Sequence, residues 1–353
     1  MTALRLPSLF LFGALFGCGS HDSAGITYTP PEVPALESVS FGLLGSGKIA
    51  FERIGGGGSY GAIYVVDATA GRSTHVFDNA VTLGPALSPD GRLLAYTHYN
   101  NSATNYDVYV ANVDGTGAQP ATNFPQQEGP PTWTTDGSRI VMVAGDFTSV
   151  IFNVFSQSPL PNPGNLTQIT HFATQAGGQF VCPIIVGNDP TVSSSSQGLL
   201  AFACQGTEID ILSPDGSLSA SYVPSQSDRR HAPAVFSPKW SPDGTRLAFI
   251  ETIADSATNY GVVAVTVKVI KADGTNATTI ASAPGSNVPA LAGWAGLNNF
   301  SLCWMPDGSR LVFNIPESDL VGHLWVVQSD GTGLTQLTSE PAAWDRSVSC
   351  SRS

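Results

Sequence analysis

Charged residues are scarce in this sequence of 353 residues, and basic residues are the scarcer kind. Only 12% of the residues are charged, and 15 lysines and arginines stand against 27 aspartates and glutamates, which gives a net charge of -12. A protein surface with this balance repels a polyanion, so we expect no nucleic-acid partner.

The composition is also poor for helices. The chain contains 37 glycines and 25 prolines, too many for a helical bundle. With 42% apolar and 9% aromatic residues it can bury a core, which argues against disorder. The composition therefore predicts a turn-rich, all-β protein.

The start of the chain lacks an apolar run long enough to span a bilayer. Arg5 precedes the run Leu6–Phe16, which has the length of a secretory signal. The end of this run, Leu15-Phe16-Gly17-Cys18, resembles the bacterial lipoprotein box. The resemblance implies a signal peptide over residues 1–17, lipidation of Cys18, a flexible stalk over residues 18–39 and a lipid anchor as the only membrane contact. It also implies the outer membrane of a bacterial cell envelope, on the periplasmic side or at the surface. The alternative is an ordinary signal peptide with an incidental cysteine.

An internal repeat sets the predicted architecture. Four segments share a strand, an Asp-Gly turn and a second strand, with turns at Asp90-Gly91, Asp136-Gly137, Asp243-Gly244 and Asp307-Gly308. Asp-Gly favours such turns because glycine adopts positive φ without a Cβ clash and aspartate can bond its own backbone. Two degenerate copies begin at Ser46 and Gln197, which brings the number of units to six.

A second Asp-Gly turn follows a further strand in most units, at Asp114, Asp215, Asp273 and Asp330. Each unit then holds four antiparallel strands, and six such units over residues 40–353 predict an all-β, six-bladed β-propeller. The C-terminal segment Arg346–Ser351 has the pattern of a lone first strand, so we expect it to complete the first blade. The alternative is that Val33–Phe41 supplies that strand.

The repeat resembles a known family. Trp240-Ser-Pro-Asp-Gly, then Arg-Leu-Ala-Phe, and later Asp-Gly-Thr and Leu-Thr segments are similar to the propeller repeats of TolB-type proteins, periplasmic components of the Tol-Pal system. The resemblance covers roughly residues 40–353. It is specific for the fold and poor for function, because related blades occur in peptidases, lyases and binding proteins.

Four cysteines remain besides Cys18, and an even number in an oxidising compartment suggests two disulfides. Three pairings are possible. Strand positions favour Cys182 with Cys204, within the fourth unit, and Cys303 with Cys350, at matching levels of first strands in adjacent blades. A metal site is the rival interpretation, but no C-x-x-C spacing supports it.

The sequence shows no catalytic constellation. The G-x-S-x-G match at Gly57–Gly61 links two strands of one predicted blade, whereas a hydrolase elbow needs a strand-to-helix turn. We predict no catalytic residue, no metal and no cofactor, and binding is favoured over enzymatic activity.

Length variation falls in the loops opposite the Asp-Gly turns, where binding usually resides on a rigid scaffold. Ser-Ala-Thr-Asn-Tyr occurs there twice, ending at Tyr106 and Tyr260, and residual blade duplication explains this repeat as well as a shared site does. Arginine suits carboxylate recognition through its planar fork, although paired rim charges are the alternative. The candidate binding residues are Tyr106, Glu128, Gln179, Arg229, Arg230, His231, Tyr260, Asn299, Asp345 and Arg346.

The sequence thus favours a monomeric, envelope-anchored scaffold that binds a protein or glycan partner through this face. The alternatives are a metal-assisted polysaccharide lyase or hydrolase and a Tol-Pal-like structural component of the envelope. Bound metal would distinguish the first alternative, and co-purification with peptidoglycan-associated lipoprotein would distinguish the second.

Overall fold

The computed structural model divides the chain into two units, Met1–Glu32 and Val33–Ser353. It describes residues 41–55, 61–78, 82–100, 105–146, 151–159, 166–171, 193–195, 197–204, 206–225, 228, 230–258, 261–283, 300–318, 321–341 and 343–351, all in the second unit. Helix α1 (Phe41–Leu44) and the 3₁₀ turn η1 (Ser256–Thr258) are single turns, and the other described elements are strands.

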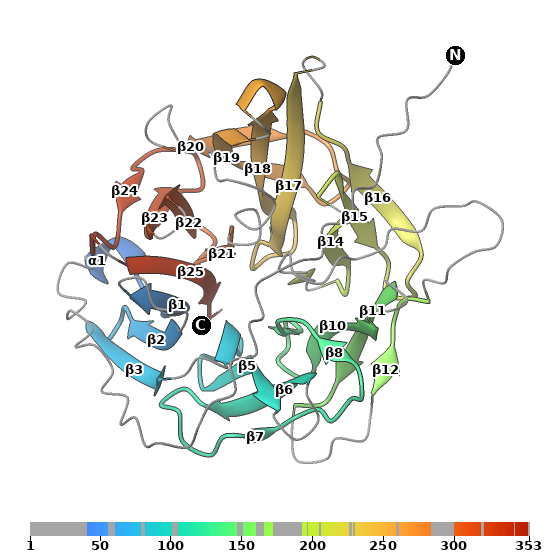
Figure 1. The fold of residues 1–353 in the computed structure, drawn as a ribbon, viewed down its shortest axis with the longest axis vertical. Helices are drawn as coiled ribbons and strands as arrows, with labels where there is room; N and C mark the ends of the chain where they lie inside the picture. The colour runs from blue at the N-terminus through green and yellow to red at the C-terminus, as the bar shows by residue number, and fades with distance from the viewer. Residues whose placement is uncertain are drawn as a thin grey trace. The chain divides into compact units, whose positions relative to one another are not determined.

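The described strands form five sheets that follow one another around a common axis, as the blades of a β-propeller do (Figure 1). Three sheets have four strands each: β4 (Thr82–Leu87), β5 (Leu93–Asn100), β6 (Asn105–Asn112) and β7 (Gln119–Pro120); β13 (Ser193–Ser194), β14 (Leu200–Cys204), β15 (Glu208–Leu212) and β16 (Leu218–Tyr222); β17 (His231–Trp240), β18 (Arg246–Asp255), β19 (Gly261–Lys271) and β20 (Thr278–Ser282). A fourth sheet has five strands: β8 (Gln127–Glu128), β9 (Thr132–Trp133), β10 (Ile140–Asp146), β11 (Ile151–Gln157) and β12 (Thr167–Gln168).

The fifth sheet has eight strands: β21 (Leu302–Trp304), β22 (Arg310–Ser318), β23 (Val321–Gln328), β24 (Thr335–Gln336), β25 (Ala343–Cys350), β1 (Lys48–Gly55), β2 (Gly61–Asp67) and β3 (Arg72–Asp78). The all-β propeller with antiparallel blades is therefore as the sequence predicts. The prediction of six separate four-stranded sheets is not met among the described residues. Four of the five sheets there have four or five strands, as one blade does, and the fifth is twice that size. The difference arises at one parallel bridge, Gly322 with Trp344, which joins two sets of strands into one sheet.

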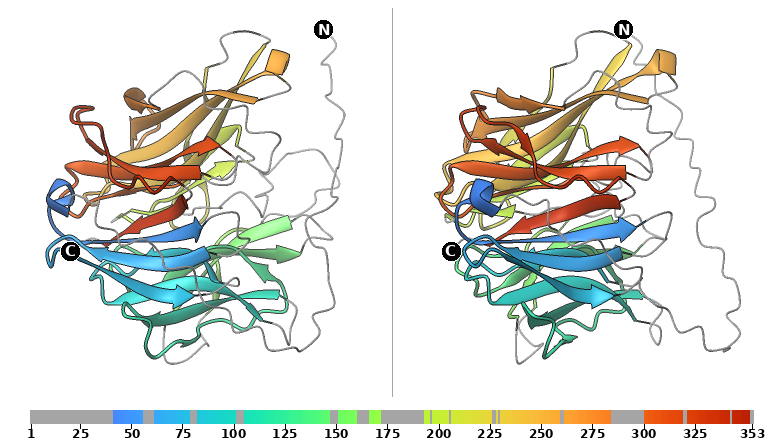
Figure 2. Two further views of the ribbon diagram at one scale, coloured as in Figure 1. Left: turned by 60° about the vertical axis from the view of Figure 1, so that its left-hand side comes forward. Right: turned by 90° about the vertical axis from the view of Figure 1, so that its left-hand side faces the viewer.

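The closing strand comes from the C-terminus, as predicted. β25 pairs antiparallel with β1, from Cys350 opposite Ile49 to Ala343 opposite Gly55. Figure 2 shows the red C-terminal strands beside the blue N-terminal ones. The alternative was that Val33–Phe41 supplies this strand. Phe41 is the one residue of that segment that the structure describes, and it belongs to helix α1.

The core lies between neighbouring sheets. Large side chains recur at one position of the second strand of several units, and Phe51, Phe202, Phe249 and Phe313 are at most 2% exposed there. Strands such as β19 consist mostly of β-branched residues, which fit a pleated surface packed on both faces. The repeat therefore buries one aromatic layer after another around the axis.

All eight predicted Asp-Gly turns are present. In each, the aspartate Oδ1 accepts the backbone N–H two residues further on, at 2.9–3.1 Å. The eight glycines have φ between 65° and 89°, a region that other residues rarely adopt. Hydrogen bonds from the turn outweigh the opposing effect of burial and lower the pKa of all eight carboxyls.

Tryptophans link neighbouring innermost strands. Trp133 Nε1 donates to the Ala86 carbonyl at 2.9 Å, and Trp304 Nε1 donates to the Lys239 carbonyl at 3.0 Å. In the preceding unit, Leu87 and Trp240 are equivalent to these two tryptophans, and each acceptor is the residue directly before one of them. The indoles thus serve as packing and as hydrogen-bond links between units.

Candidate functional site

The antiparallel topology gives every sheet two unlike ends. We call the end with the Asp-Gly turns the turn end, and the opposite end, where second strands lead to third strands and one sheet leads to the next, the loop end. Second strands finish at the loop end and third strands begin there, as at Asn100 and Asn105. The candidate residues that the structure describes all lie towards the loop end.

Two ion pairs fasten β25 to β1 near the loop end. Arg53 and Asp345 form a bidentate pair, with Nε–Oδ1 at 2.6 Å and Nη2–Oδ2 at 2.8 Å, and their side chains are 4% and 0% exposed. The next residue, Arg346, donates from Nε and Nη2 to Glu52 at 3.0 and 2.9 Å. Because a buried charge is tolerated only with a partner, each pair depends on both members.

Tyr106 lies near the start of β6, towards the loop end of its sheet. It is the cross-strand neighbour of Tyr99, and the two ring centroids are 5.2 Å apart. Burial, then Tyr99 and then Glu52 raise the pKa of Tyr106. Of the two predicted site residues Arg346 and Tyr106, Arg346 bonds Glu52 directly, whereas Tyr106 packs against Tyr99.

A further cluster, the Arg230 cluster, consists of Asp228, Arg230, His231 and Asp255. Arg230 Nε and Nη2 donate to the two Asp255 oxygens, each at 2.6 Å, and this guanidinium lowers the pKa of Asp255 to about 2. Asp228 accepts the backbone N–H groups of Arg230 and His231 and lies 2.8 Å from His231 Nδ1. Arg230 and His231 are therefore positioned by carboxylates of the chain itself.

Glu128 is the most perturbed of the predicted site residues. It is 4% exposed, and its Oε2 accepts the Val108 N–H at 2.7 Å and the Thr122 hydroxyl. Its Oε1 has no hydrogen-bond partner among the described residues. Burial raises the pKa of Glu128 to about 8, and the charge of Asp107 adds to this effect. The carboxyl is therefore mainly protonated at neutral pH.

Sequence reasoning placed some residues correctly and missed their partners. Arg346 lies in the closing strand as predicted, and this strand, β25, begins three residues earlier than expected, at Ala343, so that it also contains Asp345. Glu52 and Asp255 were not predicted, although an ionisable Glu-Arg pair inside the apolar strand Lys48–Gly55 is a usable signal. Gln179, Arg229, Tyr260 and Asn299 lie outside the described residues.

One of the two predicted disulfides is observed, and the other lies partly outside the described residues. A disulfide joins Cys303 and Cys350, with Cα atoms 5.5 Å apart, as predicted. Cys18 and Cys182 lie outside the described residues, so lipidation and the Cys182–Cys204 pairing stay predictions.

The described residues contain no group of three or more His, Cys, Asp or Glu side chains arranged to hold a metal ion. Nor does any helix within those residues have the length and hydrophobicity needed to cross a membrane.

Known proteins resemble this chain in part. No protein-family model matches it. A 45-residue segment is 47% identical to the Tol-Pal system protein TolB of Anaeromyxobacter dehalogenans (strain 2CP-C), covering 13% of this chain and 10% of that protein. The chain thus matches far less than two thirds of this curated relative.

Solved structures show the same fold. TolB from Acinetobacter baumannii superposes with a TM-score of 0.61 at 14% identity, covering 86% of this chain and 66% of that one. Hydrazine synthase of Kuenenia stuttgartiensis superposes with a TM-score of 0.57 at 11% identity, covering 92% of this chain and 50% of that one. At these identities the likeness concerns the propeller fold alone.

Proposed function

We propose that this chain is a cell-envelope protein whose propeller binds a protein partner through the loop end. The observation that carries the proposal is the contrast between the two ends. At the turn end all eight turn aspartates are satisfied by their own turns. At the loop end lie the Glu52–Arg346 pair, the Tyr99–Tyr106 ring pair, the Arg230 cluster, and Glu128, one of whose oxygens has no hydrogen-bond partner among the described residues.

We further propose that the propeller is a ring of six units. Its innermost strands make contacts in closed order, β25 with β4, β4 with β9, β9 with β13, β13 with β17, β17 with β21, and β21 with β25. Taken this way, the eight-stranded sheet consists of two four-stranded blades that share one bridge.

The remaining parts of the proposal rest on the sequence. Residues 1–17 act as a signal peptide, Cys18 carries the lipid, and residues 18–39 connect the anchor to the propeller at the outer membrane. The partner surface includes Tyr106, Arg229, Arg230, His231, Tyr260, Asn299 and Gln179, while the buried Glu128 and Asp345 and the paired Arg346 hold neighbouring groups in place.

A Tol-Pal-like role is the second candidate, because the matched 45-residue segment comes from TolB. In that case the partner is an envelope lipoprotein of the Tol-Pal system. A glycan partner is the remaining choice, and the same experiment separates the two.

The test uses two probes, the purified periplasmic domain of peptidoglycan-associated lipoprotein and a glycan array. Arg230→Gln combined with His231→Ala changes the loop end, and Asp114→Asn combined with Asp330→Asn changes the turn end as the matched control. We expect binding of the lipoprotein domain to fall at least tenfold in the loop-end variant and to stay unchanged in the control. Melting curves of both variants must match the wild type. Loss of binding only in the turn-end variant would refute the proposal, and binding to glycans alone would replace the protein partner with a glycan.

A further inference from the structure

The innermost strand of the first unit differs chemically from its equivalents. Cys350 pairs with Ile49 in the way that Trp240 pairs with Leu247 and Trp304 pairs with Leu311. Three residues before Cys350 and Trp240 stand Ser347 and Ser237, with positive φ values of 54° and 52°. Cys350 therefore occupies the position at which three other units carry tryptophan.

Its disulfide partner occupies the matching acceptor position. Trp133 and Trp304 each donate to a carbonyl of the preceding innermost strand, at Ala86 and Lys239. Each acceptor is the residue directly before the one that is equivalent to the tryptophan. Cys303 lies one residue before Trp304. The Cys303–Cys350 bond thus stands where other junctions between units have an indole-to-carbonyl hydrogen bond.

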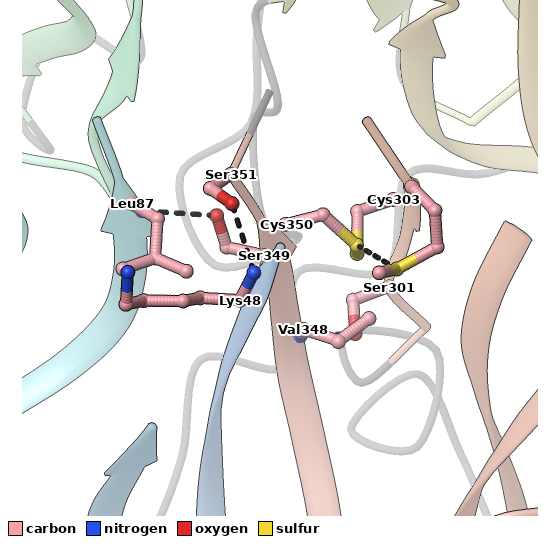
Figure 3. Close-up of a disulfide and its surroundings, with 9 residues drawn as sticks. Lys48, Leu87, Ser301, Cys303, Val348, Ser349, Cys350 and Ser351 are labelled. Atoms are coloured by element: carbon pink, nitrogen blue, oxygen red, sulfur yellow. Dashed lines mark hydrogen bonds between the residues drawn. A yellow bond between two sulfur atoms is a disulfide. The ribbon is translucent and has the colours of Figure 1, made fainter. Parts of the chain in front are cut away.

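The disulfide holds the C-terminal end of the closing strand. Around it, Ser349 Oγ accepts the Leu87 N–H at 3.0 Å, Ser351 Oγ accepts the Lys48 N–H at 2.9 Å, and the Val348 N–H donates to Ser301 Oγ at 2.9 Å (Figure 3). These are single hydrogen bonds, each worth about 1 kcal/mol in net stability. The covalent bond is the strongest of these links, and it is the one that a reductant can break.

The disulfide also borders a pocket. Cys303 and Cys350 line it together with Trp133, Trp240 and Trp304, at the turn-end side of the innermost strands. Arg346, which pairs with Glu52, lies four residues before Cys350 in the same strand, on its loop-end side. One strand therefore connects the disulfide with the proposed binding end.

We propose that the Cys303–Cys350 disulfide is a redox-sensitive clasp on the closing strand β25, whose reduction loosens β25 and, with it, the Arg346–Glu52 pair at the loop end. The reaction needs a dithiol reductant, which gives two electrons and two protons, breaks the S–S bond into two thiols and becomes a disulfide itself. Such a clasp would regulate the proposed binding end, and only its biological role rests on that proposed function.

The test is hydrogen–deuterium exchange of the full chain, read by mass spectrometry. We compare the oxidised wild type, the wild type in dithiothreitol, and the Cys303→Ser/Cys350→Ser variant. In the latter two, backbone exchange over residues 343–351 and in β1 should rise at least tenfold, while exchange in β18 and β19 stays unchanged.

Dithiothreitol also acts on any other cysteine pair, so the double variant is measured with and without it. Its exchange should be the same in both conditions. Unchanged exchange in β25 after reduction would overturn the proposal, and so would an equal rise in all sheets, which would make the disulfide a support of the whole fold. Because exchange is measured without a partner, failure here leaves the binding proposal standing, and failure of binding leaves the clasp standing.

Discussion

Replacing Glu128 by glutamine should remove a pH dependence from the stability of this protein. In the folded state the pKa of Glu128 is raised to about 8 by burial, whereas an unfolded chain gives a glutamate its ordinary value near 4.5. Folding therefore favours the protonated carboxyl. The stabilising contribution is fully present below the unfolded pKa and is lost as the pH rises through the folded pKa.

The magnitude follows from the two pKa values. Between them the unfolded state releases a proton that the folded state keeps, so stability falls by about 1.4 kcal/mol per pH unit. The fall flattens near the folded pKa, and from pH 6 to pH 8 it amounts to about 2 kcal/mol. Glutamine keeps an oxygen that can accept from the Val108 N–H and the Thr122 hydroxyl, but it cannot ionise. Its substitution shifts the stability by a constant amount and removes the slope.

The assay is urea unfolding at pH 6, 7 and 8, in wild type and Glu128→Gln, with the slope against pH as the quantity compared. Asp210→Asn is the matched control, because burial and then Glu208 raise the pKa of Asp210 to about 6 only. Because a group with this pKa loses most of its proton below pH 7, the control should reduce the fall from pH 6 to pH 8 by only about 0.4 kcal/mol. Equal slopes for wild type and Glu128→Gln between pH 6 and pH 8 would refute the buried, protonated carboxyl.

Two further substitutions test the packing. Gly216→Ala should destabilise the protein by about 2–3 kcal/mol, since φ is 84° and a Cβ would lie 2.7 Å from the Ile169 carbonyl oxygen, whereas Gly71→Ala, with φ 59° and no atom within 4 Å, should cost about 1 kcal/mol; equal urea midpoints would show that the contact between units is not tight. Asp345→Ala should cost about 3–5 kcal/mol, because it leaves the buried Arg53 without a counter-charge. A melting temperature close to that of the exposed control Asp114→Asn would contradict the burial of this pair.

The local features of the fold were predictable because their causes are local. An Asp-Gly pair specifies a turn through the φ of glycine and the hydrogen bonds of aspartate, and all eight turns are present. The closing strand and the Cys303–Cys350 pairing followed from the register of the repeat, in which one position of the unit faces the same neighbour each time.

Features set by the meeting of distant segments were not predictable in the same way. The bridge between Gly322 and Trp344 merges two sets of strands, and no pattern within either segment signals it. The partners of the predicted arginines are equally remote, since Glu52 lies 294 residues before Arg346. A sequence shows that an arginine is present, but it does not show whether a carboxylate from another strand already occupies its fork.

That occupancy changes what the loop end offers to a partner. A guanidinium has five N–H donors, and the bidentate pair with Asp255 uses two of those of Arg230, whose side chain remains 57% exposed. Arg346 is only 22% exposed and is held by a carboxylate that is itself 1% exposed. A partner carboxylate can therefore approach the outer edge of Arg230 without displacing Asp255. At Arg346 it must compete with the buried Glu52, for which Arg346 is the counter-ion among the described ion pairs. Of the two arginines, Arg230 is the one whose geometry suits a reversible contact, and Arg346 is the one whose geometry suits holding the ring closed.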